Sequence, residues 1–397
     1  MGYRDFVGSK DKQYVTEIHI ADIHFGAGNI APATQFEILQ QQFLNVIAPI
    51  DFNILSIDGD LFDRRFMADH DAVRYAIEFV NACAEICRAK MATFVILQGT
   101  KSHDADQLKL FSAYQDPNDP LDFRIIDKTC FQYIQGLKVL CIPEEYNMGE
   151  EFYRHFLDEE YDTVFMHGTN VGSVYGANQE DLNSSKYPVF SIDSFAGCHG
   201  PIICGHVHKA MCLNKYIYYV SNPIRYRFGE EDEKGFCIVL HNRFSNHHLL
   251  KFIPIESFKF ITLDIDSLTY GDPKFLIDYL NNVLENECDF IRLDFSKVND
   301  QVLQRIIEQH YINNPQVSIK RYNEKDDNPK INTTEVIKDK YAGLNFLLDP
   351  HTDQLTKFVQ FVNYNMGSQY ITIERLKKLL ENGGRPYATN PKENSYF

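Results

Sequence analysis

Two acidic segments early in the chain carry residue types that bind metal ions. Asp22 and His24 are two residues apart, so on extended backbone both side chains face the same side and can reach one ion. Asp60 and Asp63 lie in the run Gly59-Asp60-Leu-Phe-Asp63. A shared carboxylate can offset the repulsion between two divalent cations that lie about 3.5–4 Å apart. The structural alternatives are a surface role for Asp22 and His24 and a helix cap for Asp60.

A third segment, Gly99-Thr-Lys-Ser102-His103-Asp104, presents a histidine beside an acid. Glycine allows the backbone to turn tightly there. His103 could protonate a leaving oxygen or stabilise charge on phosphorus, and we expect Asp104 to orient its ring.

Two further segments carry histidines. His167 ends the run DTVFMHG, and His206 and His208 lie in the run Gly205-His206-Val-His208. Imidazoles at positions i and i+2 on extended backbone can form a pair of metal ligands. A single histidine of this kind is more often a satisfied core or surface residue, so the interpretation depends on the whole set.

The elements that must position these residues follow an alternating pattern. Strand-like and helix-like segments alternate, which is typical of an α/β sheet with helices on its faces. Four of the five segments follow a predicted strand, at the carboxyl edge where ligands of open α/β sheets bind. The predicted strands are residues 14–22, 52–60, 92–99, 137–143, 162–168, 200–206, 215–222 and 235–242, and the predicted helices are 35–48 and 72–89.

Taken in order, the five segments resemble the signature of the calcineurin-like metallophosphoesterase superfamily over roughly residues 14–245. The run GDLFDRR, an α/β unit after the core and two terminal amphipathic helices resemble the SbcD-type branch, which includes phage recombination endonuclease subunits. The resemblance implies an α/β fold, a sandwich of two β-sheets flanked by helices, followed by a small α/β capping domain and C-terminal helices. We predict a nuclease domain, a capping domain and a partner-binding helical segment over residues 1–255, 256–323 and 335–383.

The resemblance also implies a site for two divalent ions. Histidine and carboxylate ligands together favour Mn²⁺, Zn²⁺ or iron over Mg²⁺, and the resembled family favours two Mn²⁺ ions. By that resemblance one ion takes Asp22, His24, Asp60 and His208, and the other takes Asp60, His167, His206 and the residue that precedes the third-motif histidine.

The third motif departs from the family pattern. The family has Gly-Asn-His followed by an acid, whereas this run is two residues longer and has Ser102 in place of the asparagine. A serine hydroxyl is a shorter and poorer ligand, so a water or the Thr100 hydroxyl are alternatives and we expect the second ion to bind weakly. The resemblance implies in-line attack of activated water on phosphorus, with His103 at the leaving oxygen. Asp63 is expected beside the ligands, steadying a ligand or solvent.

Four arginines lie near these motifs. Arg64 and Arg65 directly follow the second motif, and Arg225 and Arg227 follow a predicted strand close after the fifth. They could contact substrate phosphates, or they could be solvated surface residues. The acidic run 230–233 is expected to be a solvated turn.

Composition excludes several classes of protein. A net charge of −16 argues against a free-standing nucleic-acid binder, but it is compatible with a partner that supplies a basic surface. No run of 18 apolar residues is present, so no membrane span is expected. Nine scattered cysteines and an N-terminus without a signal sequence favour the cytoplasm, here of a bacterial or phage-infected cell.

The leading hypothesis is a Mn²⁺-dependent DNA exonuclease or endonuclease subunit. It would act with an SbcC-like ATPase in DNA recombination, repair or replication, and a homodimer is typical of the resembled family. The alternatives are a small-molecule phosphodiesterase, a protein phosphatase, or a non-catalytic scaffold that binds a partner.

Overall fold

The structure is a computed structural model that describes residues 13–28, 30–104, 106–173, 189–245, 247–265, 271–298 and 300–321, and also 356, 359–360, 372–374 and 377. The chain divides into two compact units, Met1–Tyr322 and Asn323–Phe397. The predicted helical segment 335–383 therefore lies almost entirely outside the described residues. Within the described part of the chain, no helix is long and apolar enough to cross a membrane.

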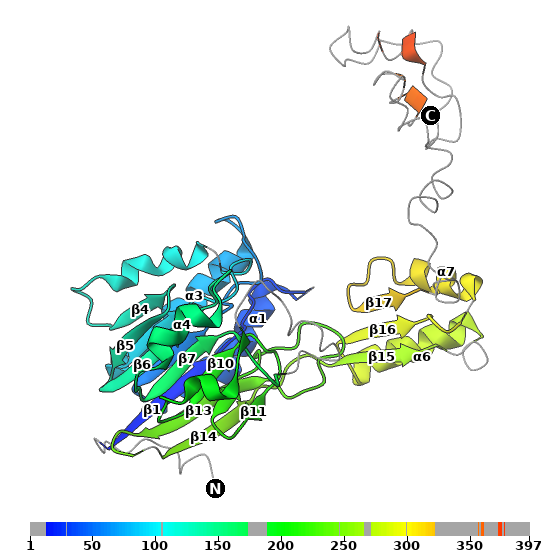
Figure 1. Ribbon diagram of the computed structural model, residues 1–397. Helices are drawn as coiled ribbons and strands as arrows, with labels where there is room; N and C mark the ends of the chain where they lie inside the picture. Colours follow the sequence, from blue (N-terminus) through cyan, green and yellow to red (C-terminus); the bar gives the residue numbers. More distant parts are fainter. Residues whose placement is uncertain are drawn as a thin grey trace. The chain divides into compact units, whose positions relative to one another are not determined.

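The first unit contains a six-stranded sheet in the order β14-β13-β1-β2-β3-β4 (Figure 1). Four neighbouring strands are parallel, and β13 and β14 extend the sheet with antiparallel pairs. The strands are β1 (Tyr14–Ile20), β2 (Ile54–Asp58), β3 (Thr93–Leu97), β4 (Phe123–Ile126), β13 (Gly235–Asn242) and β14 (His248–Pro254).

A second six-stranded sheet has the order β11-β12-β10-β7-β6-β5. Its four central strands are parallel, and its two edge strands pair antiparallel. The strands are β5 (Cys130–Ile134), β6 (Leu137–Ile142), β7 (Thr163–His167), β10 (Ile202–Gly205), β11 (Met211–Leu213) and β12 (Ile217–Tyr219), and a separate two-stranded pair consists of β8 (Thr169–Asn170) and β9 (Val189–Phe190).

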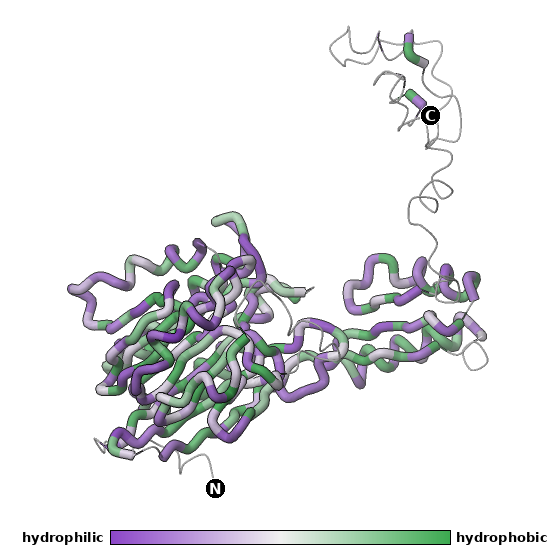
Figure 2. Tube along the Cα trace, in the orientation of Figure 1, coloured by the Kyte–Doolittle hydropathy of each residue, from purple (hydrophilic) through white to green (hydrophobic). Residues whose placement is uncertain are grey.

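The two sheets pack face to face through buried apolar side chains. Val15 and Val95 of the first sheet share one cluster with Val139 and Phe165 of the second. Figure 2 shows apolar stretches concentrated along the strands, with polar stretches at the loops. Burial of this kind stabilises the fold by about 25 cal/mol per Å² of apolar surface.

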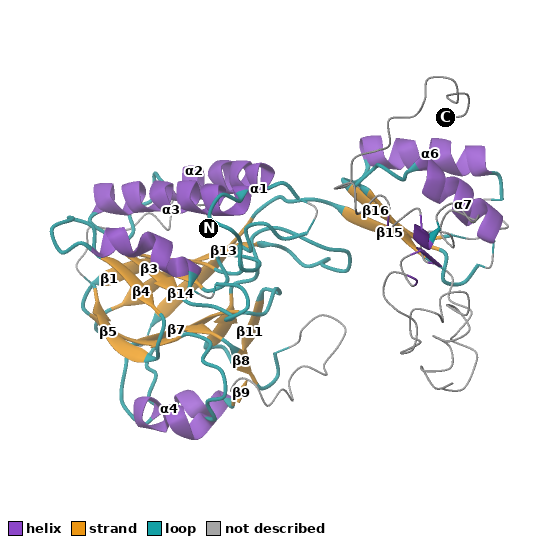
Figure 3. Ribbon diagram, turned by 90° about the horizontal axis from the view of Figure 1, so that it is seen from above, coloured by secondary structure: helices purple, strands orange, loops and turns teal. Residues whose placement is uncertain are grey.

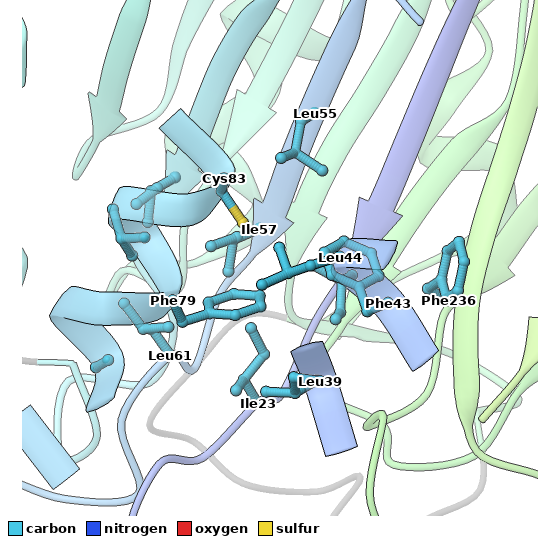
Figure 4. Close-up of a cluster of buried hydrophobic side chains, with 14 of the residues drawn as sticks. Ile23, Leu39, Phe43, Leu44, Leu55, Ile57, Leu61, Phe79, Cys83 and Phe236 are labelled. Carbon is cyan, nitrogen blue, oxygen red and sulfur yellow. The ribbon is translucent and has the colours of Figure 1, made fainter. Parts of the chain in front are cut away.

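Helices cover the outer faces of both sheets, as Figure 3 shows. The first sheet packs against α1 (Pro32–Leu39), η2 (Gln40–Leu44), α2 (Asn45–Ile47) and α3 (Asp71–Lys90), and the second against α4 (Glu150–Leu157). In Figure 4, Phe43 and Phe79 from the helices lie against Ile57 of β2 and Phe236 of β13. The prediction of an α/β fold with two sheets flanked by helices is confirmed.

A smaller α/β unit follows β14. Its three parallel strands are β15 (Phe260–Asp264), β16 (Phe290–Asp294) and β17 (Val317–Lys320), and its helices are α6 (Pro273–Asn286) and α7 (Gln301–His310). Leu276 and Leu280 of α6 and Ile307 of α7 pack on the strands in a separate cluster. The element order is β-α-β-α-β. A small α/β unit is expected for residues 256–323, and the domain boundaries stay predictions.

A charged cluster lies buried between the two sheets. Glu17, His19 and Asp58 are each 0% exposed. The two ring nitrogens of His19 lie 2.8 Å from a carboxylate oxygen of Asp58 and 3.2 Å from one of Glu17. A carboxylate only accepts, so both nitrogens donate and His19 is an imidazolium. Burial lowers the pKa of His19, but the charges and hydrogen bonds of Asp58 and Glu17 outweigh burial and raise the pKa to about 9.

This cluster predicts a pH-dependent stability. The folded-state pKa of His19 lies above its unfolded value of 6.5, so its stabilising contribution is fully present below pH 6.5 and is lost as the pH rises through 9. The contribution amounts to about 3 kcal/mol, since each pKa unit corresponds to about 1.4 kcal/mol. Urea unfolding at pH 6 and pH 10 should show a larger loss of unfolding free energy for the wild type than for His19→Gln. Equal losses would contradict the imidazolium assignment.

Candidate metal centre

The carboxyl ends of the parallel strands bring the predicted residues to one edge of the sandwich. Asp22 and Asp60 follow β1 and β2 of the first sheet, and His167 and His206 lie at the ends of β7 and β10 of the second. The main-chain N–H of His206 donates to both carboxylate oxygens of Asp22, at 3.0 and 2.9 Å. This contact joins the two sheets at the site.

The first group of ligand atoms comes from Asp22, His24 and His208. These atoms all lie within 4.8 Å of one another. Nε2 of His24 lies 3.0 Å from Nε2 of His208, which lies 3.9 Å from a carboxylate oxygen of Asp22. The structure thus brings together three residues that the sequence assigns to one ion.

The second group comes from Asp60, His167 and His206, again within 4.8 Å. Nδ1 of His167 donates to the main-chain carbonyl of Asp58 at 2.8 Å. A carbonyl can only accept, so Nδ1 carries a proton and Nε2 is the nitrogen directed at the site. This orientation leaves Nε2 as the nitrogen that can bind a metal ion.

Asp60 connects the two groups through a single atom. Its Oδ2 lies 3.7 Å from Nε2 of His24 and 3.4 Å from Nε2 of His167. His24 belongs to the first group and His167 to the second. One carboxylate oxygen therefore faces both sets of nitrogens, which is the placement that a ligand shared by two cations needs.

The charges of the site favour cations. Burial raises the pKa of Asp60, but His167 and His24 outweigh burial and hold that pKa well below its usual range. Burial, together with the neighbouring His167, lowers the pKa of His206 to about 3, and burial also lowers that of His24. His167 differs, because Asp60 and the other carboxylates outweigh burial and raise its pKa well above the usual value. Metal ions bind neutral imidazoles and ionised carboxylates, so a metal ion would replace the proton on His167.

The backbone at the site is held in an uncommon conformation. Asp22, His24, Asp60 and His206 have φ of 53°, 48°, 53° and 86°, in the left-handed region that non-glycine residues rarely adopt. Strain of this kind persists where the surrounding structure imposes it, and it clusters at functional sites.

Close approach explains two glycines of the motifs. A Cβ atom on Gly59 would overlap the ring of His167, and one on Gly99 would overlap the carboxylate and main-chain nitrogen of Asp60. Both positions lie where loops from different strands meet. A side chain at either position would push the ligands apart.

His103 lies beside the first group, with its ring centroid 4.8 Å from that of His24. Its Nδ1 donates to the main-chain carbonyl of Asp63, so Nε2 is the atom that can exchange a proton with substrate. His24, Asp63 and His103 themselves form a third group of ligand atoms within 4.8 Å. The side chain of Asp63 is 27% exposed and is therefore reachable by solvent.

Asp104 does not have the position that we expected for orienting His103. Its buried carboxylate accepts from the main-chain N–H groups of Gly99, Asp60 and Phe62, at 2.8, 3.1 and 3.2 Å. Burial and the charge of Asp60 raise its pKa to about 7. Asp104 thus ties the second and third motif loops together, and the carbonyl of Asp63 orients His103.

Ser102 is exposed, unlike the buried ligands around it. It shares hydrogen bonds with the Tyr146 hydroxyl. Thr100 lies closer to the site, because its N–H donates to Asp60 at 2.6 Å and its hydroxyl donates to Glu144 at 3.1 Å. The sequence reading did not single out Glu144, which is 3% exposed and follows the predicted strand over 137–143. An acid at a strand end was the signal that could have found it.

The expectation of a solvated turn at 230–233 is wrong for Glu230, which is buried. Its side chain is 8% exposed, and one carboxylate oxygen lies 3.7 Å from Nδ1 of His208. The other lies 3.7 Å from Nζ of Lys234, which is buried and donates to the carbonyl of His208 at 2.6 Å. The two residues form a buried ion pair that fixes His208 from behind, as partners of metal-binding histidines do.

The four arginines differ in their surroundings. Arg225 donates to the carbonyls of Glu230 and Asp232, so it holds the adjacent loop. Arg227 is exposed and paired with Glu230 at 3.1 Å. Arg64 and Arg65 are exposed, and Arg64 lies 3.8 Å from Asp63. Arg64 and Arg65 lie on the loop that carries Asp60, and both are exposed.

The residues present fit two divalent metal ions. Carboxylate oxygens and imidazole nitrogens converge in two groups that share Asp60. A buried carboxylate oxygen, Oε1 of Glu144, has no hydrogen-bond partner among the described residues. Mixed oxygen and nitrogen donors of this kind suit first-row transition metals.

Comparisons with known proteins give a distant likeness. No model of a known protein family matches the chain. The chain is 23% identical over 238 residues to protein 244L of Invertebrate iridescent virus 6, across 57% of this chain and 76% of the viral protein. It is 23% identical over 272 residues to protein 078R of Invertebrate iridescent virus 3, across 63% and 70%. Both viral proteins have provisional phosphoesterase names.

A solved structure aligns with 60% of this chain and 99% of its own, at 14% identity and a TM-score of 0.37, which is too low to carry an argument. The chain is thus similar to two viral proteins that have phosphoesterase names, and its ligand groups can hold divalent metal ions. The assignment to the SbcD-type branch stays a prediction.

Proposed function

We propose that this protein is a two-metal phosphodiesterase whose substrate is DNA. The observation that carries the proposal is the position of Asp60 Oδ2, 3.7 Å from His24 and 3.4 Å from His167. When bound, two divalent ions, which we propose to be Mn²⁺, supply Lewis-acid activation of water and of the phosphoryl group. Asp22, His24, Asp60, His167, His206 and His208 would hold them.

The chain's own residues supply the rest of the chemistry. His103 keeps one proton on Nδ1 through the Asp63 carbonyl and has Nε2 for the substrate. A proton delivered from Nε2 would neutralise the leaving alkoxide of a phosphodiester. Asp104 holds the loops that set the distance between Asp60 and His103.

Three observations favour DNA as the substrate and an SbcC-like ATPase as the partner. The run GDLFDRR and the α/β unit after the core resemble the SbcD-type branch. Arg64 and Arg65 are exposed next to the site, where they can contact phosphates. A net charge of −16 suits a subunit whose partner supplies most of the basic surface, and a homodimer is part of the same proposal.

The test is degradation of end-labelled linear duplex and single-stranded DNA by the purified protein. We expect degradation with Mn²⁺ and none with EDTA. Hydrolysis of an aryl phosphodiester without DNA degradation would favour a small-molecule phosphodiesterase. Absence of both activities, with no bound metal, would favour a scaffold and overturn the proposal. Addition of the ATPase, once identified, is expected to raise the rate.

A further inference from the structure

We propose that Glu144 is a ligand of the second metal ion, in place of the amide that the third motif lacks. The proposal rests on the two-metal function above. Glu144 lies outside the five motifs and follows β6. With Glu144 as a ligand, the second metal site no longer lacks the ligand whose absence made weak binding expected.

Strand pairing delivers Glu144 to the second group. β6 and β7 are parallel, with Ile142 beside Met166. Glu144 is two residues beyond Ile142, and His167 is one residue beyond Met166. Both side chains therefore emerge at the same edge of the second sheet, where the loop that contains Thr100 meets them.

The distance from Glu144 to His206 matches that between two ligands of one ion, and the distance to His167 is longer. Oε2 of Glu144 lies 3.2 Å from Nδ1 of His206 and 3.9 Å from Nε2 of His167. Two ligand atoms that are each about 2.1 Å from one ion lie roughly 3.0–3.4 Å apart for octahedral or tetrahedral geometry. The Asp60–His167 distance of 3.4 Å falls in the same range.

The burial of Glu144 disfavours its ionised form unless a positive charge lies nearby. The side chain is 1% exposed, and no lysine or arginine among the described residues forms a salt bridge with it. Thr100 donates to Oε2, and Oε1 has no hydrogen-bond partner in the described part of the chain. A buried carboxylate in such surroundings is unfavourable unless a positive charge compensates it. A divalent ion between Glu144, Asp60 and the imidazoles would provide that charge.

This arrangement changes the expected affinity. A carboxylate carries a charge that an asparagine amide does not, so Glu144 strengthens the attraction for the second cation. Thr100 holds the carboxylate by its hydroxyl, and exposed Ser102 is not required as a ligand.

The experiment is calorimetric titration of the metal-free full-length protein with Mn²⁺. We expect two ions per chain for the wild type. Glu144→Ala should bind one ion normally and the second at least about tenfold more weakly. Electron paramagnetic resonance should show a coupled Mn²⁺ pair in the wild type and isolated Mn²⁺ in the variant. Glu144→Gln, which restores an amide oxygen, should retain two ions with a weakened second site.

Glu145→Gln is the matched control, because Glu145 accepts from the N–H and hydroxyl of Thr129 and not from the site. It should bind two ions like the wild type. Two ions of unchanged affinity in Glu144→Ala, or none in the wild type, would overturn the proposal. So would a crystal soaked in Mn²⁺ that shows a water between Glu144 and the ion. A wild type that binds two ions but cleaves no DNA would refute the proposed function and leave the Glu144 assignment standing.

Discussion

Asp60→Asn is expected to abolish DNA cleavage and to remove the coupled pair of Mn²⁺ ions. The Asp60 carboxylate oxygen faces both His24 and His167. Replacing the carboxylate with a neutral amide therefore removes a negative charge that both metal sites share. Loss of one transition-state donor costs about 10²–10³-fold in kcat, and loss of both ions should cost at least about 10³-fold. Cleavage of labelled duplex in Mn²⁺ and the Mn²⁺ stoichiometry measure the two effects.

The matched control is Asp69→Asn, an exposed aspartate on the same loop. It should keep both ions and full activity. Circular dichroism melting should show that Asp60→Asn is folded, since the amide keeps the size of the side chain. An Asp60→Asn protein that still binds two ions and cleaves DNA would contradict the proposal that Asp60 is a ligand shared by both ions.

His103→Gln is expected to lower kcat for DNA by about 10²–10⁴-fold while two Mn²⁺ ions remain bound. The variant loses the Nε2 proton donor, but the Asp60, His167 and His206 group stays intact. An aryl phosphodiester should lose much less activity, because its phenolate leaving group needs little protonation. The ratio of the two losses thus measures proton delivery to the leaving oxygen.

His155→Gln serves as the control for removal of an exposed histidine from this protein. It should change neither rate. Equal losses on both substrates would indicate that His103 stabilises charge on phosphorus and does not deliver a proton to the leaving oxygen. A loss of bound Mn²⁺ in His103→Gln would instead make His103 a metal ligand, as its proximity to His24 and Asp63 allows.

Much of the fold is readable in the sequence because strand-end motifs and hydrophobic periodicity are local. The strands that became β1, β2, β3, β6, β7, β10, β12 and β13 were predicted at or near their observed bounds. β4, β5, β8, β9, β11 and β14 were not predicted. Four of them, β4, β5, β11 and β14, are the edge strands of the two six-stranded sheets, where long-range pairing decides whether a segment becomes a strand. The π-helical turn η2 inside the predicted helix 35–48 was also not visible in the spacing.

The sequence by itself predicted the candidate metal ligands at the ends of β1, β2, β7 and β10. Asp22, Asp60, His167 and His206 lie in short strand-end motifs, and the structure places them in two neighbouring groups of candidate ligand atoms. The contacts of Asp104, Glu230 and Glu144 at the site were decided only by tertiary structure. Each depends on which loops the two sheets place against each other, and that follows from strand register, which no local spacing encodes.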